Sequence, residues 1–217
     1  MSVAPDASGD VQAWRKATRK ALIEGRVAAG DAARHAWNRG IEAHLERLLP
    51  TIACEIVGFC WPYKDEPDAR PVVQRLMDRG ARAALPVVVA PRTPLAFREW
   101  RPGCAMQEGA HGIPEPGPDA AEVTPDLVLL PMNGFDAAGY RLGYGSGFFD
   151  RTLASLDRRP TVIGLCYELG RLDTIRPQPH DIPLDFVVTE AGAWRRGAAG
   201  LAPVRSGARE DDDRRDR

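Results

Sequence analysis

Residues 126–151 read DLVLLPMNGFDAAGYRLGYGSGFFDR and carry the strongest structural signal in the chain. The run 126–131 is short and, after Asp126, continuously apolar, which is typical of a strand buried on both faces of a sheet. A glycine-rich loop follows it, and RTLASL (151–156) then has the pattern of a helix. A buried strand, a glycine loop and a helix in this order predict a unit of an α/β fold.

The same alternation continues on both sides of this unit. Apolar spacing predicts helices at 11–29, 31–49 and 70–80, strands at 52–61, 83–89, 95–100, 161–167 and 185–189, and a Gly- and Pro-rich loop at 101–120. We therefore expect a three-layer, Rossmann-like α/β fold with a central, largely parallel sheet flanked by helices. Residues 10–196 would form a single domain. The small polar residues 1–9 and the charged residues 197–217 would be disordered.

The composition argues against several classes of protein. The 217 residues include 29 basic and 30 acidic ones, for a formal net charge of −1, so bulk attraction to nucleic acid or to an anionic membrane is not expected. The chain contains no run of 18 apolar residues that would indicate a membrane span. Its four cysteines form no CxxC pair and no cluster with zinc spacing. We expect a reduced, cytoplasmic protein that is a monomer or a weak dimer.

The glycine loop suggests phosphate binding. At Gly143, Gly145 and Gly147 the backbone can adopt positive φ, and N–H groups at the start of the next helix could surround phosphate oxygens. Arg141 could neutralise a phosphate, and Asp150 could hold a magnesium ion that bridges phosphate oxygens. However, the spacing G-x-G-x-G matches neither GxxxxGK[ST] nor GxGxxG. Since glycines after a strand often only form a tight turn, spacing alone leaves both interpretations open.

A longer pattern around the loop resembles a known family. FDAAGYRLGYGSGFFDR (135–151) is similar to the signature of the 5-formyltetrahydrofolate cyclo-ligase family, which has an FD pair, G-x-RLG-x-G-x-G, two aromatic residues and DR. Further similar segments are RKATRK (15–20), KDEPDARPVV (64–73), DRGARAALPVV (78–88), GIPEP (112–116) and HDIPLDFVVTE (180–190). The resemblance covers roughly residues 14–194.

This resemblance implies a reaction and its partners. The family converts 5-formyltetrahydrofolate into 5,10-methenyltetrahydrofolate, uses ATP as co-substrate with Mg²⁺, and releases ADP and phosphate. The formyl oxygen is phosphorylated, and the folate N10 then closes the ring. The alternative is a non-catalytic nucleotide- or folate-binding relative of the same fold. An RNA-binding protein is a third hypothesis, against which the near-zero net charge argues.

The resemblance also implies roles for particular residues. The ATP-contacting loop would comprise Arg141, Leu142, Gly143, Tyr144, Gly145, Ser146, Gly147, Phe148 and Phe149, and its residues 144–148 would also face the folate. Arg141 and Tyr144 would be catalytic. Trp61 and Glu66 would contact the folate. Arg15 and Arg19 would reach ATP from one helix face, because they lie four residues apart. Asp150 and Asp185 would be the magnesium ligands, with Asp181 as a weaker candidate.

Three positions depart from the family pattern. Arg15 stands where the family usually has a lysine. Ser146 stands where some members carry a lysine that could touch the transferred phosphate, so other groups must supply that charge here. Gly170 stands where a glutamine is frequent, which affects the expected shape of the adenine or folate pocket.

Overall fold

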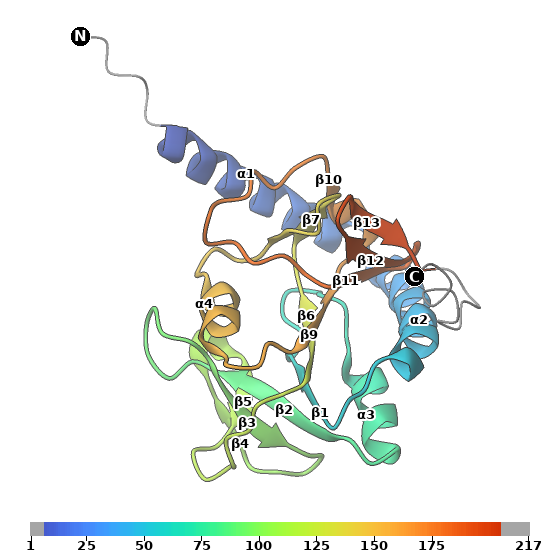
Figure 1. Ribbon diagram of the computed structural model, residues 1–217, viewed down its shortest axis with the longest axis vertical. Coiled ribbons are helices and arrows are strands. Elements are labelled where there is room, and N and C mark those ends of the chain that lie inside the picture. Colours follow the sequence, from blue (N-terminus) through green and yellow to red (C-terminus); the bar gives the residue numbers. More distant parts are fainter. Residues whose placement is uncertain (1–6, 205–217) are drawn as a thin grey trace, which may run out of the picture.

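The computed structural model describes residues 7–204, with side chains from residue 10 onward, and is built on an eight-stranded sheet (Figure 1). Its strands are β1 (Ile56–Phe59), β2 (Arg82–Val87), β3 (Ala96–Trp100), β6 (Leu127–Pro131), β9 (Thr161–Leu165), β11 (Phe186–Thr189), β12 (Gly192–Gly197) and β13 (Gly200–Pro203). They lie in the order β13-β12-β11-β9-β6-β1-β2-β3. The five strands from β11 to β2 run parallel, whereas β3, β12 and β13 are antiparallel at the edges. The predicted α/β fold with a largely parallel sheet is therefore confirmed.

Helices cover both faces of this sheet. They are α1 (Ala7–Ala28), α2 (Asp31–Leu48), α3 (Arg70–Asp78) and α4 (Phe148–Ser155). Short 3-10 helices occur at η1 (Leu49–Thr51), η2 (Ala110–Gly112) and η3 (Glu168–Gly170). Figure 1 shows α2 and α3 on one side of the sheet and α4 on the other. Leu127 and Leu129 of β6 pack in the core beneath α2 and α3, and Val128 and Leu130 pack in a second core with Leu153 of α4. Because successive strand residues point to opposite faces, the continuous apolar run reflects burial on both.

A second, smaller sheet leads from β6 to the glycine loop. It consists of β7 (Gly134–Asp136), β8 (Arg141–Leu142) and β10 (Arg171–Leu172). The buried carboxylate of Asp136 accepts hydrogen bonds from the N–H groups of Ala138 (3.1 Å), Tyr140 (3.0 Å) and Ile175 (3.1 Å). Asp136, the acid of the FD pair, thus fixes the turn before Arg141 and connects it to a distant segment.

Several predicted boundaries are wrong. Helix α1 begins at Ala7, so the expectation of disorder for residues 1–9 fails at residues 7–9, while 1–6 lie outside the described residues. The predicted loop 101–120 contains a hairpin of β4 (Met106–Glu108) and β5 (Pro114–Pro116). The expected disorder of 197–217 is wrong for 197–204, because β13 pairs with β12 there. Residues 205–217 lie outside the described part of the chain.

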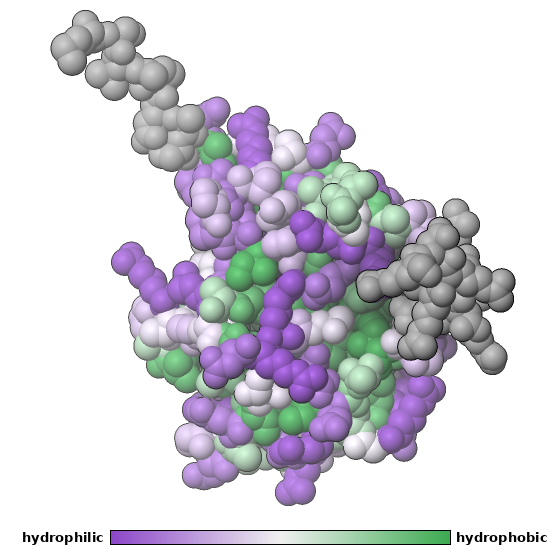
Figure 2. Space-filling model, in the orientation of Figure 1, coloured by the Kyte–Doolittle hydropathy of each residue, from purple (hydrophilic) through white to green (hydrophobic). Residues whose placement is uncertain are grey.

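The surface agrees with the composition. Polar and charged side chains cover most of the face shown in Figure 2, and apolar residues form only small groups between them. Among the described helices none is both long and apolar enough to cross a bilayer. All four cysteines are free thiols.

Candidate active site

A cavity of about 490 Å³ lies at the carboxyl ends of the central strands. Cys60 and Trp61, which directly follow β1, line it together with Leu130 and Pro131 of β6 and with Pro86 of β2. The sheet reverses its order here, since β2 lies on one side of β1 and the next parallel strand, β6, lies on the other. Ligands of open α/β sheets bind at such a switch point.

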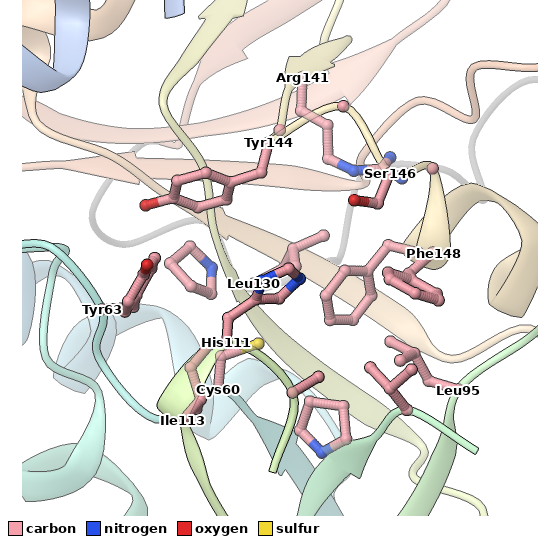
Figure 3. Close-up of a pocket in the computed structure, with 18 of the residues that line it drawn as sticks. Cys60, Tyr63, Leu95, His111, Ile113, Leu130, Arg141, Tyr144, Ser146 and Phe148 are labelled. Carbon is pink, nitrogen blue, oxygen red and sulfur yellow. The ribbon is translucent and has the colours of Figure 1, made fainter. Parts of the chain in front are cut away.

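The glycine loop forms one wall of the cavity. All nine residues from Arg141 to Phe149 line it, and Figure 3 shows Tyr144, Ser146 and Phe148 along this wall. Positive φ occurs at Gly145 (101°) and at Gly147 (64°), which is the N-cap of α4, but not at Gly143. The expected backbone freedom is therefore confirmed at two of the three glycines. The free N–H groups at the start of α4 belong to residues of this wall.

Arg15 and Arg19 lie on one face of α1 but have different partners. Arg15 is buried and donates to the carbonyl oxygens of Ile175 (3.2 Å) and Arg176 (2.9 Å) and to Asp181 (2.5 Å). The Arg19 guanidinium lies against Gly145, and its buried Nε has no hydrogen-bond partner among the described residues. Burial and the charge of Arg15 lower the pKa of Arg19. Arg15 therefore holds a neighbouring segment, whereas the Nε of Arg19, which is unpaired among the described residues, could meet an anion.

Arg141 and Asp150 form a partly buried ion pair at the end of the loop. Arg141 donates to Asp150 Oδ1 (2.7 Å) and to the carbonyl oxygen of Ile182 (2.5 Å). Burial lowers the pKa of Arg141, and the charge of Asp150 opposes this. The N–H of Ile182 also donates to Oδ1 of Asp150 (2.9 Å). Both hydrogen bonds therefore go to Oδ1, and Oδ2 accepts none from the described residues. This oxygen is available for a ligand.

Asp150 fits a magnesium ion that is held together with phosphate. Mg²⁺ is usually bound through one or two carboxylates plus substrate phosphates rather than in an all-protein cage. Within residues 7–204 no group of three or more His, Cys, Asp or Glu side chains could hold a metal by itself. The donor set therefore suits magnesium that arrives with a nucleotide.

Asp185 does not reach the cavity, contrary to the expectation that it shares a magnesium ion with Asp150. It directly precedes β11 and so lies at the amino end of a parallel strand, whereas the cavity lies at the carboxyl ends. Its carboxylate accepts the N–H of Val162 (2.8 Å) and pairs with Arg159 (3.2 Å). The second aspartate that lines the cavity is Asp181, and Arg15 already neutralises it.

Trp61 and Glu66 line the cavity, as expected for residues that contact a folate. Trp61 packs edge-on against Trp100, with ring centroids 6.2 Å apart. Glu66 is only 5% exposed, and its Oε2 accepts the N–H of Tyr63 (3.1 Å). Its Oε1 is buried without a partner among the described residues. Burial raises the pKa of Glu66, and the nearby charge of Arg26 opposes the rise.

The sequence did not single out three other residues at this site. Tyr63 faces Tyr144 at a ring distance of 5.8 Å, and Figure 3 shows both on the side of the cavity away from Phe148. His111 lines the cavity from η2 with a positive φ of 63°. Arg26 donates to the hydroxyl of Tyr144 (3.1 Å) from behind the wall. The only sequence feature that could have pointed to His111 is its position directly before GIPEP (112–116). Arg26 could not be distinguished from the many other arginines of the chain.

A family model supports the interpretation of the loop. The model of the 5-formyltetrahydrofolate cyclo-ligase family matches residues 11–190. The chain belongs to this family. The resemblance carried by residues 135–151 is thereby confirmed, and the protein is placed among ligases that act on folate in one-carbon metabolism.

Individual relatives agree with the family assignment. The chain is 31% identical over 191 residues to a 5-formyltetrahydrofolate cyclo-ligase of Mycolicibacterium smegmatis, covering 84% of this chain and 95% of that protein. It is 30% identical over 151 residues to a 5-formyltetrahydrofolate cyclo-ligase of Escherichia coli, covering 67% and 83%. Among solved structures, the 5,10-methenyltetrahydrofolate synthetase of Aquifex aeolicus superposes with a TM-score of 0.71 at 25% identity, covering 92% of this chain and 98% of that one.

Proposed function

We propose that this cyclo-ligase family member converts 5-formyltetrahydrofolate into 5,10-methenyltetrahydrofolate with ATP and Mg²⁺, releasing ADP and phosphate. One observation carries the proposal. The same cavity is lined by the glycine loop with Arg19 and Asp150, which suit a nucleotide, and by Glu66 and Trp61, which suit a folate. The γ-phosphate and the formyl group could therefore meet within one enclosure.

The chemistry requires activation of a poor leaving group. The formyl oxygen on N5 attacks the γ-phosphorus of ATP, an O–P bond forms, and the bond from phosphorus to the ADP oxygen breaks. The N10 lone pair then attacks the activated formyl carbon. N10 loses its proton, the C–O bond breaks, and phosphate leaves. Catalysis of such a transfer is mostly positioning and charge stabilisation.

Arg19 is the cation best placed to stabilise the transferring phosphoryl group. Arg141 is already paired with Asp150, and Arg15 with Asp181. Ser146 brings no charge to the loop. The guanidinium of Arg19 lies over Gly145 with its Nε unpaired among the described residues, so it can donate to phosphate oxygens as charge develops. Asp150 Oδ2 would hold Mg²⁺, which supplies further neutralisation of the phosphates when bound.

Tyr144 serves this reaction as a hydrogen-bond donor rather than as a base. Burial and the neighbouring Glu66 carboxylate raise the pKa of its phenol. The hydroxyl therefore remains protonated at neutral pH. It accepts a hydrogen bond from Arg26, and its own proton is available to Glu66 or to a ligand in the cavity.

A spectroscopic assay tests the proposal. Purified protein mixed with 5-formyltetrahydrofolate, ATP and Mg²⁺ should develop the near-ultraviolet absorbance of the methenyl product and release ADP in equal amount. AMP in place of ADP would contradict phosphoryl transfer. No absorbance change with folded protein would refute the enzymatic proposal, and folate-dependent ATP binding without turnover would favour the non-catalytic alternative.

A further inference from the structure

Arg26 is a buried cation to which the described residues offer no salt-bridge partner. It lies in the last turn of α1 and is 3% exposed. It donates to the Tyr144 hydroxyl (3.1 Å) and, at 3.4 Å, to Asn133 Oδ1, but forms no ion pair with a described carboxylate. Burying a guanidinium among neutral partners costs free energy, unless its charge is used elsewhere.

Glu66 is the complementary case. It is a buried carboxylate that also lacks an ion pair among the described residues. Three buried polar atoms in this region have no hydrogen-bond partner in the described chain, namely Glu66 Oε1, Arg26 Nε and Asn133 Nδ2. Such atoms are rare in folded proteins and each costs free energy when unpaired. Of the three, only Glu66 belongs to a residue that lines the cavity, so its Oε1 is the atom that a ligand N–H could satisfy.

We propose that Arg26 is a positioning residue for the folate end of the cavity. Its guanidinium holds the Tyr144 hydroxyl in place and provides the counter-charge for Glu66, so that Glu66 Oε1 is presented as a charged acceptor to an N–H group of the substrate. The inference rests on the proposed function for the identity of that substrate. Arg26 itself does not line the cavity and acts only through Tyr144 and Glu66.

The electrostatics of Glu66 follow from its neighbours. Burial raises the pKa of Glu66, and the charge of Arg26 is the largest effect that lowers it, followed by Tyr144 and the N–H of Tyr63. On the β1 side, burial raises the pKa of Cys60, and the charge of Glu66 raises it further. A hollow behind Glu66 holds further charged and titratable groups: Asp31, Arg34, His35, Lys64, Asp65, Asp68, Arg70 and Tyr167. Of these, histidine has an ordinary pKa near neutrality, so His35 needs a control.

The kinetic test compares Arg26→Met with Arg26→Lys. Arg26→Met should raise the KM for 5-formyltetrahydrofolate about tenfold and leave the KM for ATP nearly unchanged, since one charge-assisted contact is lost at the folate end. The acidic limb of kcat/KM for the folate should move up by about one pH unit, because a neighbouring positive charge is removed from Glu66. Arg26→Lys should restore the limb. If Arg26 had a merely structural role, Arg26→Met would change both KM values and leave the acidic limb of the pH profile in place. That result would overturn the proposal.

A second measurement needs no activity. Carbon-13 NMR of glutamate carboxyls in the ligand-free protein, with Glu66→Gln identifying the signal, should show a higher pKa for Glu66 in Arg26→Met than in the original protein. If Glu66 titrates at the same pH in Arg26→Met and in the original protein, the inference is overturned. Lack of enzymatic activity in the original protein would count only against the proposed function. His35→Gln should leave the Glu66 titration in place, and a shift there would also overturn it.

Tyr144→Phe covers the case in which Arg26→Met does not fold. This variant keeps α1 intact and removes only the hydroxyl that Arg26 holds. It should raise the KM for the folate more than that for ATP. Equal KM values in Tyr144→Phe and the original protein would contradict the positioning role.

Discussion

Gly145→Ala provides the sharpest test of the glycine loop. Gly145 has a φ of 101°, a conformation that costs a residue with a Cβ about 1–2 kcal/mol. An added Cβ would also lie 3.0–3.1 Å from three atoms of the Arg19 guanidinium. The substitution therefore strains the backbone and displaces the side chain that we assign to the phosphates.

Gly143→Ala is the matched control. No heavy atom lies within 4 Å of a Cβ built at Gly143, and its φ is not positive. Both substitutions restrict the unfolded chain by a similar amount, about 0.4–1 kcal/mol. The difference in unfolding free energy between the two variants therefore isolates the strain at Gly145, and Gly145→Ala should be less stable than Gly143→Ala by about 1–2 kcal/mol.

Thermal unfolding and steady-state kinetics test the strain at Gly145 and the role of Arg19. Thermal unfolding followed by circular dichroism should place Tm of Gly145→Ala about 2–8 °C below that of Gly143→Ala. The KM for ATP should rise about tenfold in Gly145→Ala, because a charge-assisted contact from Arg19 is lost. Equal Tm values for the two variants would refute the argument from positive φ, whatever the kinetics show.

Further substitutions test the charged groups. Asp150→Asn should raise the Mg²⁺ concentration needed for half-maximal turnover, whereas Asp185→Asn should cost about 1–2 kcal/mol of stability and leave that requirement unchanged; Mg²⁺ titration of both variants checks this. Burial alone would raise the pKa of Asp181, but the hydrogen bonds from a buried arginine of α1 and from the N–H of Gln178, together with the nearby positive charges, outweigh burial and hold the pKa below its ordinary value. This stabilisation is present above about pH 4 and lost as the pH falls through the lower folded value, so Asp181→Asn should weaken the acid sensitivity seen in urea unfolding. Arg19→Met should raise the KM for ATP, and Ser146→Lys should restore part of the loss in the double variant; no rescue would mean that Arg19 acts by shape rather than charge.

The central sheet could be predicted because its signal is local. The apolar run 127–130 is buried on both faces of the sheet, and its sequence pattern predicts a buried strand without knowledge of the helices that cover it. The small β4–β5 hairpin and the β12–β13 hairpin at the edge of the central sheet could not be predicted in this way. β4 and β5 are three residues each, β5 contains two prolines, and β12 carries two exposed arginines, so pairing rather than periodicity makes them strands.

The candidate site shows a similar division. The loop 141–149 could be placed from its glycines and its resemblance to a family, and the spacing of Arg15 and Arg19 correctly put both on one helix face. Their different partners could not be foreseen, because those depend on a segment 160 residues away. Asp185 was misplaced because a sequence match fixes the residue type but not the edge of the sheet at which it lies.

The two ends of the cavity differ in charge. Near the glycine loop, Arg141 and Arg15 each pair with a lining aspartate, and Arg19 adds positive charge beyond these two pairs. At the other end Glu66 presents a buried acceptor that the described chain leaves unsatisfied. A nucleotide phosphate is favoured at the first end and a donor-rich ring at the second, so the two substrates are sorted before they react.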